Sequence, residues 1–264
     1  MSLREVAADR LSCLVAWARS AALVGRMGGR PAPLVEVAGL LLVILLFSWL
    51  HAIAGKDVAA ATANALALQS IERALHLDIE LRANQWLTEH PSLIQLAVYY
   101  YRLYYLAIIG VLVWVYVRHA DVYIKVRRTL VAMLVLVLPV FWALPMSPPR
   151  FALPGVVDII AGHDLLGGHA SRGIENGQNL YSAMPSMHVG WSLWCAYAAW
   201  YALRASHPRL ALLSWIFPLG MTAVVLITGN HYVLDIAGSA VLLAVSIAVV
   251  SVWGHLTEHR RAGG

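Results

Sequence analysis

Long apolar runs alternate with short polar segments along most of the chain. Six runs approach the roughly 20 residues that a helix needs to cross a bilayer; they lie near residues 34–54, 93–117, 129–146, 186–203, 210–228 and 232–253. Backbone hydrogen bonds in hydrocarbon must be satisfied within the segment, so the runs predict helices. The third run is short and contains Pro139, which predicts a tilt, a kink or an earlier start. We therefore expect an all-α integral membrane protein with six transmembrane helices.

Two further segments mix apolar and polar positions. Residues 2–27 combine arginines with leucines, and residues 58–89 carry leucine and isoleucine among polar neighbours. Both predict amphipathic helices that lie in the membrane interface. The expected organisation is an amphipathic cytoplasmic segment at 1–33, a six-helix membrane domain at 34–253 and a disordered cytoplasmic tail at 254–264.

The composition supports this class. The chain is 60% hydrophobic and 12% charged, whereas soluble domains carry about 25% charged residues. The net charge of +5 is spread over short polar segments without a stripe of interleaved aromatics, so we expect no nucleic-acid partner. Cys13 and Cys195 are far apart and predict neither a disulfide framework nor a metal knuckle.

The distribution of basic residues predicts an orientation. Thirteen Lys and Arg lie in residues 1–33, 118–128, 204–209 and 254–264, against five in 55–91 and 147–185. The richer side is expected to be cytoplasmic, which places both termini there. The starts of the fourth and sixth runs then face outward together with the loop 147–185. The sequence thus predicts a multi-pass protein of the cell membrane with any site at these starts on the extracytoplasmic side.

Ionisable residues mark both of these starts. His231 and Asp235 stand four residues apart, which places them on one face of a helix, where the carboxylate can orient the imidazole. His188 opens the fourth run. Ionisable groups at the edge of a membrane span are costly and therefore indicate function.

This set of residues fits phosphoryl transfer, which needs a nucleophile, an acid for the leaving oxygen and positive potential. His231, with its carboxylate, is the better nucleophile, and His188 is the better general acid. Pro185 is expected at the first helical position and Asn230 at an N-cap, so that free N–H groups bind phosphate, with Ser186 adding a hydroxyl.

The segments Met184–His188 and Gly229–Gly238 resemble the second and third signatures of the type 2 phosphatidic acid phosphatase superfamily. The resemblance covers about residues 58–253 and is closest to the membrane branch with inositol phosphorylceramide synthase and sphingomyelin synthase. It implies a phosphohistidine on His231, orientation of that ring by Asp235, and protonation of the leaving group by His188. It implies no metal and no other cofactor, and phosphorylated lipids as substrates.

The chain also departs from other members. The Lys–Arg first signature is not recognisable, and Val224-Val225 replace a Ser-Arg pair ahead of the third signature. Arg150 is the first substitute for the missing phosphate clamp, although it also fits a charge that marks the end of a span. Arg102, within a tyrosine-rich segment that alternatively forms an interfacial belt, is the second.

Other polar residues receive weaker predictions. Asn179 and Tyr181 precede the second signature and are expected to line the site. Glu72 and Glu80 are expected to pair with Arg73 or Arg82 and have no predicted role. The outer loop contains Asp158, His163, Asp164, His169 and Arg172, which fit a solvated glycine-rich cap better than a metal site.

The leading hypothesis is a membrane enzyme that breaks a phosphoester bond of a lipid phosphate or phospholipid head group. Water as acceptor makes it a phosphatase, and a hydroxyl acceptor makes it a phosphotransferase. Its partners are then the phosphorylated lipid and the surrounding membrane lipids, with the oligomeric state open. The alternative is a catalytically silent lipid-binding or lipid-translocating protein of the same fold. A third hypothesis, a vanadate-dependent peroxidase, has soluble relatives, unlike this chain.

Overall fold

The computed structural model describes residues 30–163 and 179–262. The chain divides into two units, Met1–Leu46 and Phe47–Gly264. Within the described ranges every regular secondary-structure element is a helix. An isolated β-bridge joins Met146 to Ser182 in this part of the chain. The all-α prediction is confirmed.

Five segments of the described chain are long and apolar enough to cross a membrane. They are Pro33–Ile53 (α2), Pro91–Arg118 (α5, Pro91–Arg102, and α6, Tyr104–Arg118), Ala120–Ala143 (α7), Pro208–Ile227 (α11, Pro208–Leu213, and α12, Ile216–Ile227) and Val233–His259, within α13 (Val233–Ala262). The predicted fourth span is the apolar helix α10, Met187–Leu203, whose 17 residues are slightly short for a full crossing. The structure therefore has five candidate spans by length, against the six predicted.

Several boundaries differ from the predicted ones. Helix α7 begins at Ala120, so the basic segment 118–128 is mostly helical rather than a loop. Helix α13 continues to Ala262, so the predicted disordered tail is helical over 254–262. Residues 58–89 do form two helices, α3 (Val58–Ala74) and α4 (Glu80–Thr88). The amphipathic segment predicted at 2–27 lies outside the described residues.

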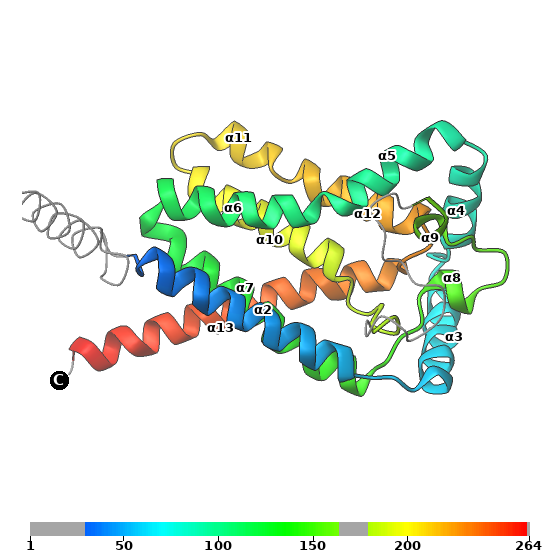
Figure 1. Cartoon of the computed structure of the whole chain (residues 1–264), viewed down its shortest axis with the longest axis horizontal. Helices are drawn as coiled ribbons and strands as arrows, with labels where there is room; N and C mark the ends of the chain where they lie inside the picture. The colour runs from blue at the N-terminus through cyan, green and yellow to red at the C-terminus, as the bar shows by residue number, and fades with distance from the viewer. Residues whose placement is uncertain (1–29, 164–178, 263–264) are drawn as a thin grey trace, which may run out of the picture. The chain divides into compact units, whose positions relative to one another are not determined.

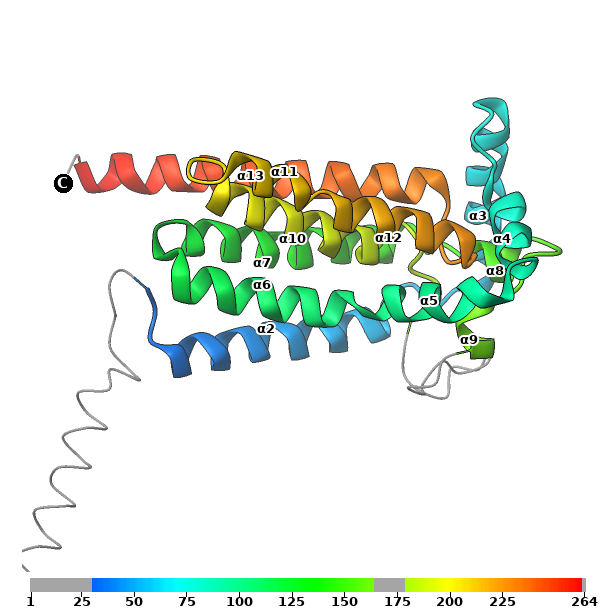
Figure 2. The same cartoon turned by 90° about the horizontal axis from the view of Figure 1, so that it is seen from above.

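Helices α6, α7, α10, α12 and α13 of the second unit run alongside one another in both views (Figures 1 and 2). Helix α10 packs against α6, α7, α12 and α13. Its residues Trp194, Ala196 and Ala198 are buried, and the Trp194 indole N–H donates to the Val126 carbonyl at 3.0 Å. The central position of α10 explains how a helix this short is covered on most of its surface.

Short helices gather at the end of these long helices where α10 and α13 begin (Figure 1). They are α3, α4, α8 (Pro149–Ala152) and α9 (Ile159–His163). Helix α3 packs on α13 and α8, α4 packs on α12, and α9 packs on α5. This end therefore brings residues from distant parts of the sequence around the starts of α10 and α13.

Candidate active site

A tight turn between α12 and α13 carries His231. The turn begins at Gly229, whose φ of +69° is unfavourable for residues with a side chain. A Cβ at this position would lie 2.6 Å from Val156 Cγ1. The Val225 carbonyl then accepts N–H groups from Asn230 at 3.0 Å and from His231 at 3.3 Å. These two hydrogen bonds fix the backbone at His231 against the end of α12.

Hydrogen bonds define the tautomer of the His231 ring. Its Nδ1 lies 2.9 Å from the Ala183 carbonyl oxygen and 3.3 Å from Asp235 Oδ2. A carbonyl only accepts hydrogen bonds, so Nδ1 must carry the proton. In the neutral imidazole with this tautomer, Nε2 has the free lone pair. Asp235 is fully buried, and its Oδ2 also accepts the Tyr232 N–H at 2.9 Å.

His188 lies beside this pair, with its ring centroid 5.9 Å from that of His231. Its ring stacks on Tyr101 at 4.1 Å and meets the edge of Tyr104 at 4.7 Å. The N–H of Ser186 donates to the Asp235 carbonyl at 3.2 Å, and the hydroxyl of Ser239 donates to the Ser186 carbonyl at 2.7 Å. These contacts join the starts of α10 and α13 and thereby bring the two histidines together.

Arg150 of α8 lies against the His231 turn. Its Nη1 donates to Asn230 Oδ1, and its backbone N–H donates to the Gly229 carbonyl at 3.0 Å. Its Nε is 3.2 Å from Asp158 Oδ2, and its side chain is 11% exposed. The guanidinium is therefore held beside the turn that carries His231, with limited access to solvent.

Arg102 ends α5, directly before the break at Leu103. Its guanidinium carbon is 6.0 Å from the centroid of the Tyr101 ring, which stacks on His188. Arg102 and His188 thus both contact the Tyr101 ring.

Residues 66–249 match the PAP2 superfamily. The chain belongs to the PAP2 superfamily. Members of this superfamily are generally phosphatases, and membership supports a phosphatase-type phosphoesterase activity. Comparisons with curated proteins and with solved structures give no significant match.

Two predictions about the helix starts in this PAP2 protein are wrong. Ser186, not Pro185, precedes the first residue of α10 as its N-cap; its buried hydroxyl accepts the Val189 N–H at 3.3 Å. Asn230 is not the cap of α13, which begins at Val233. Its side-chain amide instead donates to Thr228 Oγ1 at 2.7 Å while its oxygen accepts from Arg150. Asn230 therefore positions Arg150.

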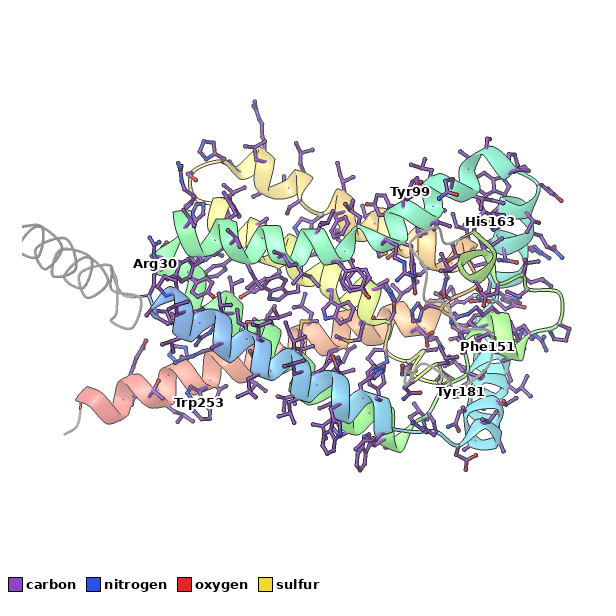
Figure 3. All side chains as sticks on the ribbon, viewed as in Figure 1. Arg30, Tyr99, Phe151, His163, Tyr181 and Trp253 are labelled. Carbon is purple, nitrogen blue, oxygen red and sulfur yellow. The ribbon has the colours of Figure 1, made fainter. Side chains whose placement is uncertain are left out.

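The residues ahead of the second signature have structural contacts. Asn179 donates to the Ala54 carbonyl at 2.7 Å and accepts the Tyr181 N–H at 2.9 Å. The Tyr181 ring lies 6.5 Å from that of Phe151 in α8, and Figure 3 shows the two labelled side chains close together. Asn179 thus fixes the segment that leads into α10.

The outer loop is only partly described. Asp158 pairs with Arg150, whereas His163 is exposed at the end of α9. Asp164, His169 and Arg172 lie outside the described residues. Asp158 is therefore tied to the site rather than being only part of a solvated cap.

Two buried glutamates have contacts that the sequence did not predict. Glu72 Oε1 accepts the Leu234 N–H at 2.7 Å, and Glu80 Oε1 accepts the Val233 N–H at 3.2 Å. With Asp235 on the Tyr232 N–H, carboxylates occupy these three successive amides at the start of α13. This helix start does not offer those N–H groups to a phosphate, contrary to expectation. The predicted pairing with Arg73 or Arg82 is not found among the described residues, where Arg73 instead lies 3.8 Å from Asp78.

The burial of Glu72 could have been predicted from the sequence. Glu72 continues a stripe of buried positions on α3 formed by Ala61, Ala65 and Leu68, at spacings of three and four residues. A carboxylate on such a stripe must be buried with a partner. Asn84 of α4 is similar: it is fully buried, and its side chain bonds the Val157 N–H and the carbonyls of Val157 and Ile227.

Proposed function

We propose that the protein is a membrane-embedded phosphoesterase that acts on a lipid phosphate or phospholipid head group through a phosphohistidine on His231. The observation that carries this proposal is the His231 ring, whose Nδ1 is bound to the Ala183 carbonyl. Nε2 is left as the nucleophilic atom, and His188 lies beside it. The arrangement supports a nucleophile and an acid acting on one phosphoester.

In the first step, His231 Nε2 attacks phosphorus and forms the P–N bond. The bond from phosphorus to the lipid oxygen breaks, and that oxygen takes a proton from His188. The imidazole of His231 gains positive charge during this step. The buried carboxylate of Asp235, 3.3 Å from Nδ1, stabilises that charge and keeps the ring in place.

In the second step, an acceptor hydroxyl gives its proton to His188 and attacks phosphorus, and the P–N bond breaks. Water as the acceptor releases inorganic phosphate from a lipid phosphate, or the phosphorylated head group from a phospholipid. A lipid or sugar-alcohol hydroxyl gives phosphotransfer of the kind found in inositol phosphorylceramide synthase. Both outcomes use the same residues, so the acceptor alone distinguishes a phosphatase from a transferase.

Arg150 and Arg102 supply positive charge for the phosphate oxygens in this proposal. Val224 and Val225, at the place of the Ser-Arg pair in other members, are packed in the core and carry no charge. Arg150 is held by Asn230 and Asp158, which favours a fixed guanidinium plane suited to phosphate. Neither Asn230 nor Ser186 is needed as a direct phosphate ligand.

The proposed location is the cell membrane, with cytoplasmic termini and an extracytoplasmic site. Basic residues at the junctions α6–α7 and α10–α11 lie at the end of the helices away from the site: Arg118, Lys125, Arg127, Arg128, Arg204 and Arg209. This segregation supports a cytoplasmic assignment for that end.

Turnover of a substrate panel tests the proposed function. Purified protein in lipid nanodiscs is incubated with lipid phosphates and phosphodiesters, with and without hydroxyl acceptors, and released phosphate and new lipids are measured. We expect His231→Ala to lose on the order of 10³-fold or more in rate. The matched variant His90→Ala, at an exposed histidine, keeps the parent rate. A catalytically silent protein would turn over nothing, and parent-like rates in His231→Ala would exclude His231 as nucleophile.

A further inference from the structure

Two glutamates from outside the long helices lie directly behind the proposed nucleophile. Glu72 comes from α3 and Glu80 from α4, and their side chains are 0% and 1% exposed. Each accepts one N–H at the start of α13, at Leu234 and Val233 respectively. Asp235, which holds the His231 ring, is the next residue along the helix.

This arrangement is costly for a simple helix cap. A serine or aspartate at the N-cap itself can satisfy the first N–H groups without bringing buried carboxyl groups from other helices. No group of His, Cys, Asp and Glu within the described ranges fits a metal ion, so metal binding does not account for these acids. The acids therefore need another explanation.

The charged groups around Glu72 are close enough to affect one another. They are Glu80 of α4 and Asp235 of α13, with the Tyr232 hydroxyl nearby. Burial raises the pKa of Glu72 to about 8, opposed by the Leu234 N–H and assisted by the charges of Glu80 and Asp235. The buried carboxyl group of Glu72 therefore favours its protonated form more strongly than an exposed carboxyl group does.

We propose that Glu72 and Glu80 are positioning residues of the phosphoryl-transfer site, which fix the first turn of α13 so that Asp235 meets His231. The contact between Asp235 Oδ2 and His231 Nδ1 is already 3.3 Å, so a shift of the turn by about 1 Å removes it. Anchoring two successive N–H groups from two different helices restricts both translation and rotation of this turn. The role in catalysis rests on the proposed function, whereas the effect on the His231 ring does not.

The test uses four variants of the full-length protein in nanodiscs. Glu72→Met and Glu80→Met remove the acceptors at similar volume. Glu72→Gln keeps an oxygen for the Leu234 N–H but cannot ionise. Glu89→Met is the control, because Glu89 is exposed at the end of α4.

Two readouts are compared. Nitrogen-15 NMR of the His231 imidazole, assigned with His231→Ala, reports which ring nitrogen carries the proton. Steady-state kinetics on the best substrate of the panel give kcat and KM. In both Met variants we expect loss of the fixed Nδ1–H tautomer and a 10- to 100-fold lower kcat with KM within about twofold. Glu72→Gln and Glu89→Met should match the parent in both readouts at pH 7.

The pH profile covers the case in which the Met variants do not fold. Ionisation of Glu72 beside Glu80 and Asp235 should loosen the turn, so the ratio of parent kcat to Glu72→Gln kcat falls as pH rises past about 8. A constant ratio from pH 6 to 9.5, or folded Met variants with the parent tautomer and kcat, would overturn the proposal. If His231→Ala itself retains activity, the proposed function fails, while the NMR result still decides whether the glutamates position the ring.

Discussion

Asp235 serves the site through a single oxygen atom. Its Oδ2 receives both the His231 Nδ1–H and the Tyr232 N–H. An asparagine can keep both contacts through its amide oxygen, but it has no negative charge to stabilise the imidazolium that forms on His231. We predict that Asp235→Asn lowers kcat by about 10³- to 10⁴-fold with little change in KM. Steady-state kinetics check this, and a loss below tenfold would show that the charge of Asp235 does not assist the nucleophile.

In the proposed mechanism, Arg150 holds the phosphate. It is largely buried beside the turn that carries His231. Arg150→Lys keeps the charge but cannot present the planar fork, so we predict a 10- to 100-fold lower kcat/KM, and a larger loss for Arg150→Ala. Arg73→Ala is the control, since the Arg73 side chain is 63% exposed. Equal effects of the alanine variants on kcat/KM would remove Arg150 from the clamp.

Gly229 is required by the conformation of the turn. Gly229→Ala places a Cβ at positive φ and 2.6 Å from Val156 Cγ1. We predict a loss of about 2–3 kcal/mol in the free energy of unfolding. Gly110→Ala is the matched control, because a Cβ at Gly110 meets no atom within 4 Å. Thermal unfolding in the same detergent measures both variants, and equal melting temperatures would contradict the strain.

Residue-level prediction succeeded where the information is local. The spacing of His231 and Asp235 indicates their shared helix face, and the structure has these side chains in contact. The role of Asn230 was not predictable, because its partner Arg150 lies 80 residues away in sequence. The spacing of residues along the sequence does not show which distant polar side chain will form a hydrogen bond with Asn230.

At the level of elements, burial of Glu72 on α3 makes the stability of the fold depend on pH. The pKa of Glu72 is raised from its ordinary value of 4.5 to about 8. The unfolded chain therefore releases this proton at lower pH than the folded chain, so stability is lost as pH rises from about 4.5 to about 8. Glu72→Gln removes the ionisable group, and with it this loss of stability, while keeping the acceptor for the Leu234 N–H.

We predict that the melting temperature of Glu72→Gln matches the parent near pH 4.5 and exceeds it increasingly up to about pH 8. Differential scanning fluorimetry across this range measures the difference. A difference that does not vary with pH would mean that Glu72 titrates as an ordinary exposed carboxylate.

The apolar runs predicted the helices but not all of their ends. The basic segment 118–128 was interpreted as a loop because it is polar, yet Arg and Lys are good helix formers, and α7 includes most of it. The break between α5 and α6 was not predictable, because no proline or glycine lies at it. The contacts of Glu72 and Glu80 were not predicted because their partners lie 162 and 153 residues away, on α13.

For the molecule as a whole, the distribution of basic residues predicts which end of the long helices faces the outside of the cell. Asp78, between α3 and α4, and Ser206, between α10 and α11, are both exposed and lie at opposite ends of the long helices of the second unit. In a variant lacking Cys13 and Cys195, we predict that Asp78→Cys reacts with a membrane-impermeant maleimide in intact cells. Ser206→Cys should react only after permeabilisation. The reverse pattern would invert the topology.

In the proposed mechanism, His231 carries the phosphate as a phosphohistidine. Trapping that phosphohistidine during turnover is the direct test of this role. Protein turning over a lipid labelled with phosphorus-32 is quenched with alkali and digested, and the labelled peptide is identified. We predict an acid-labile, alkali-stable label on His231 that disappears in His231→Ala and accumulates with His188→Ala on a substrate with a good leaving group. Turnover by the parent without label on His231, or with the label on another residue, would contradict the account.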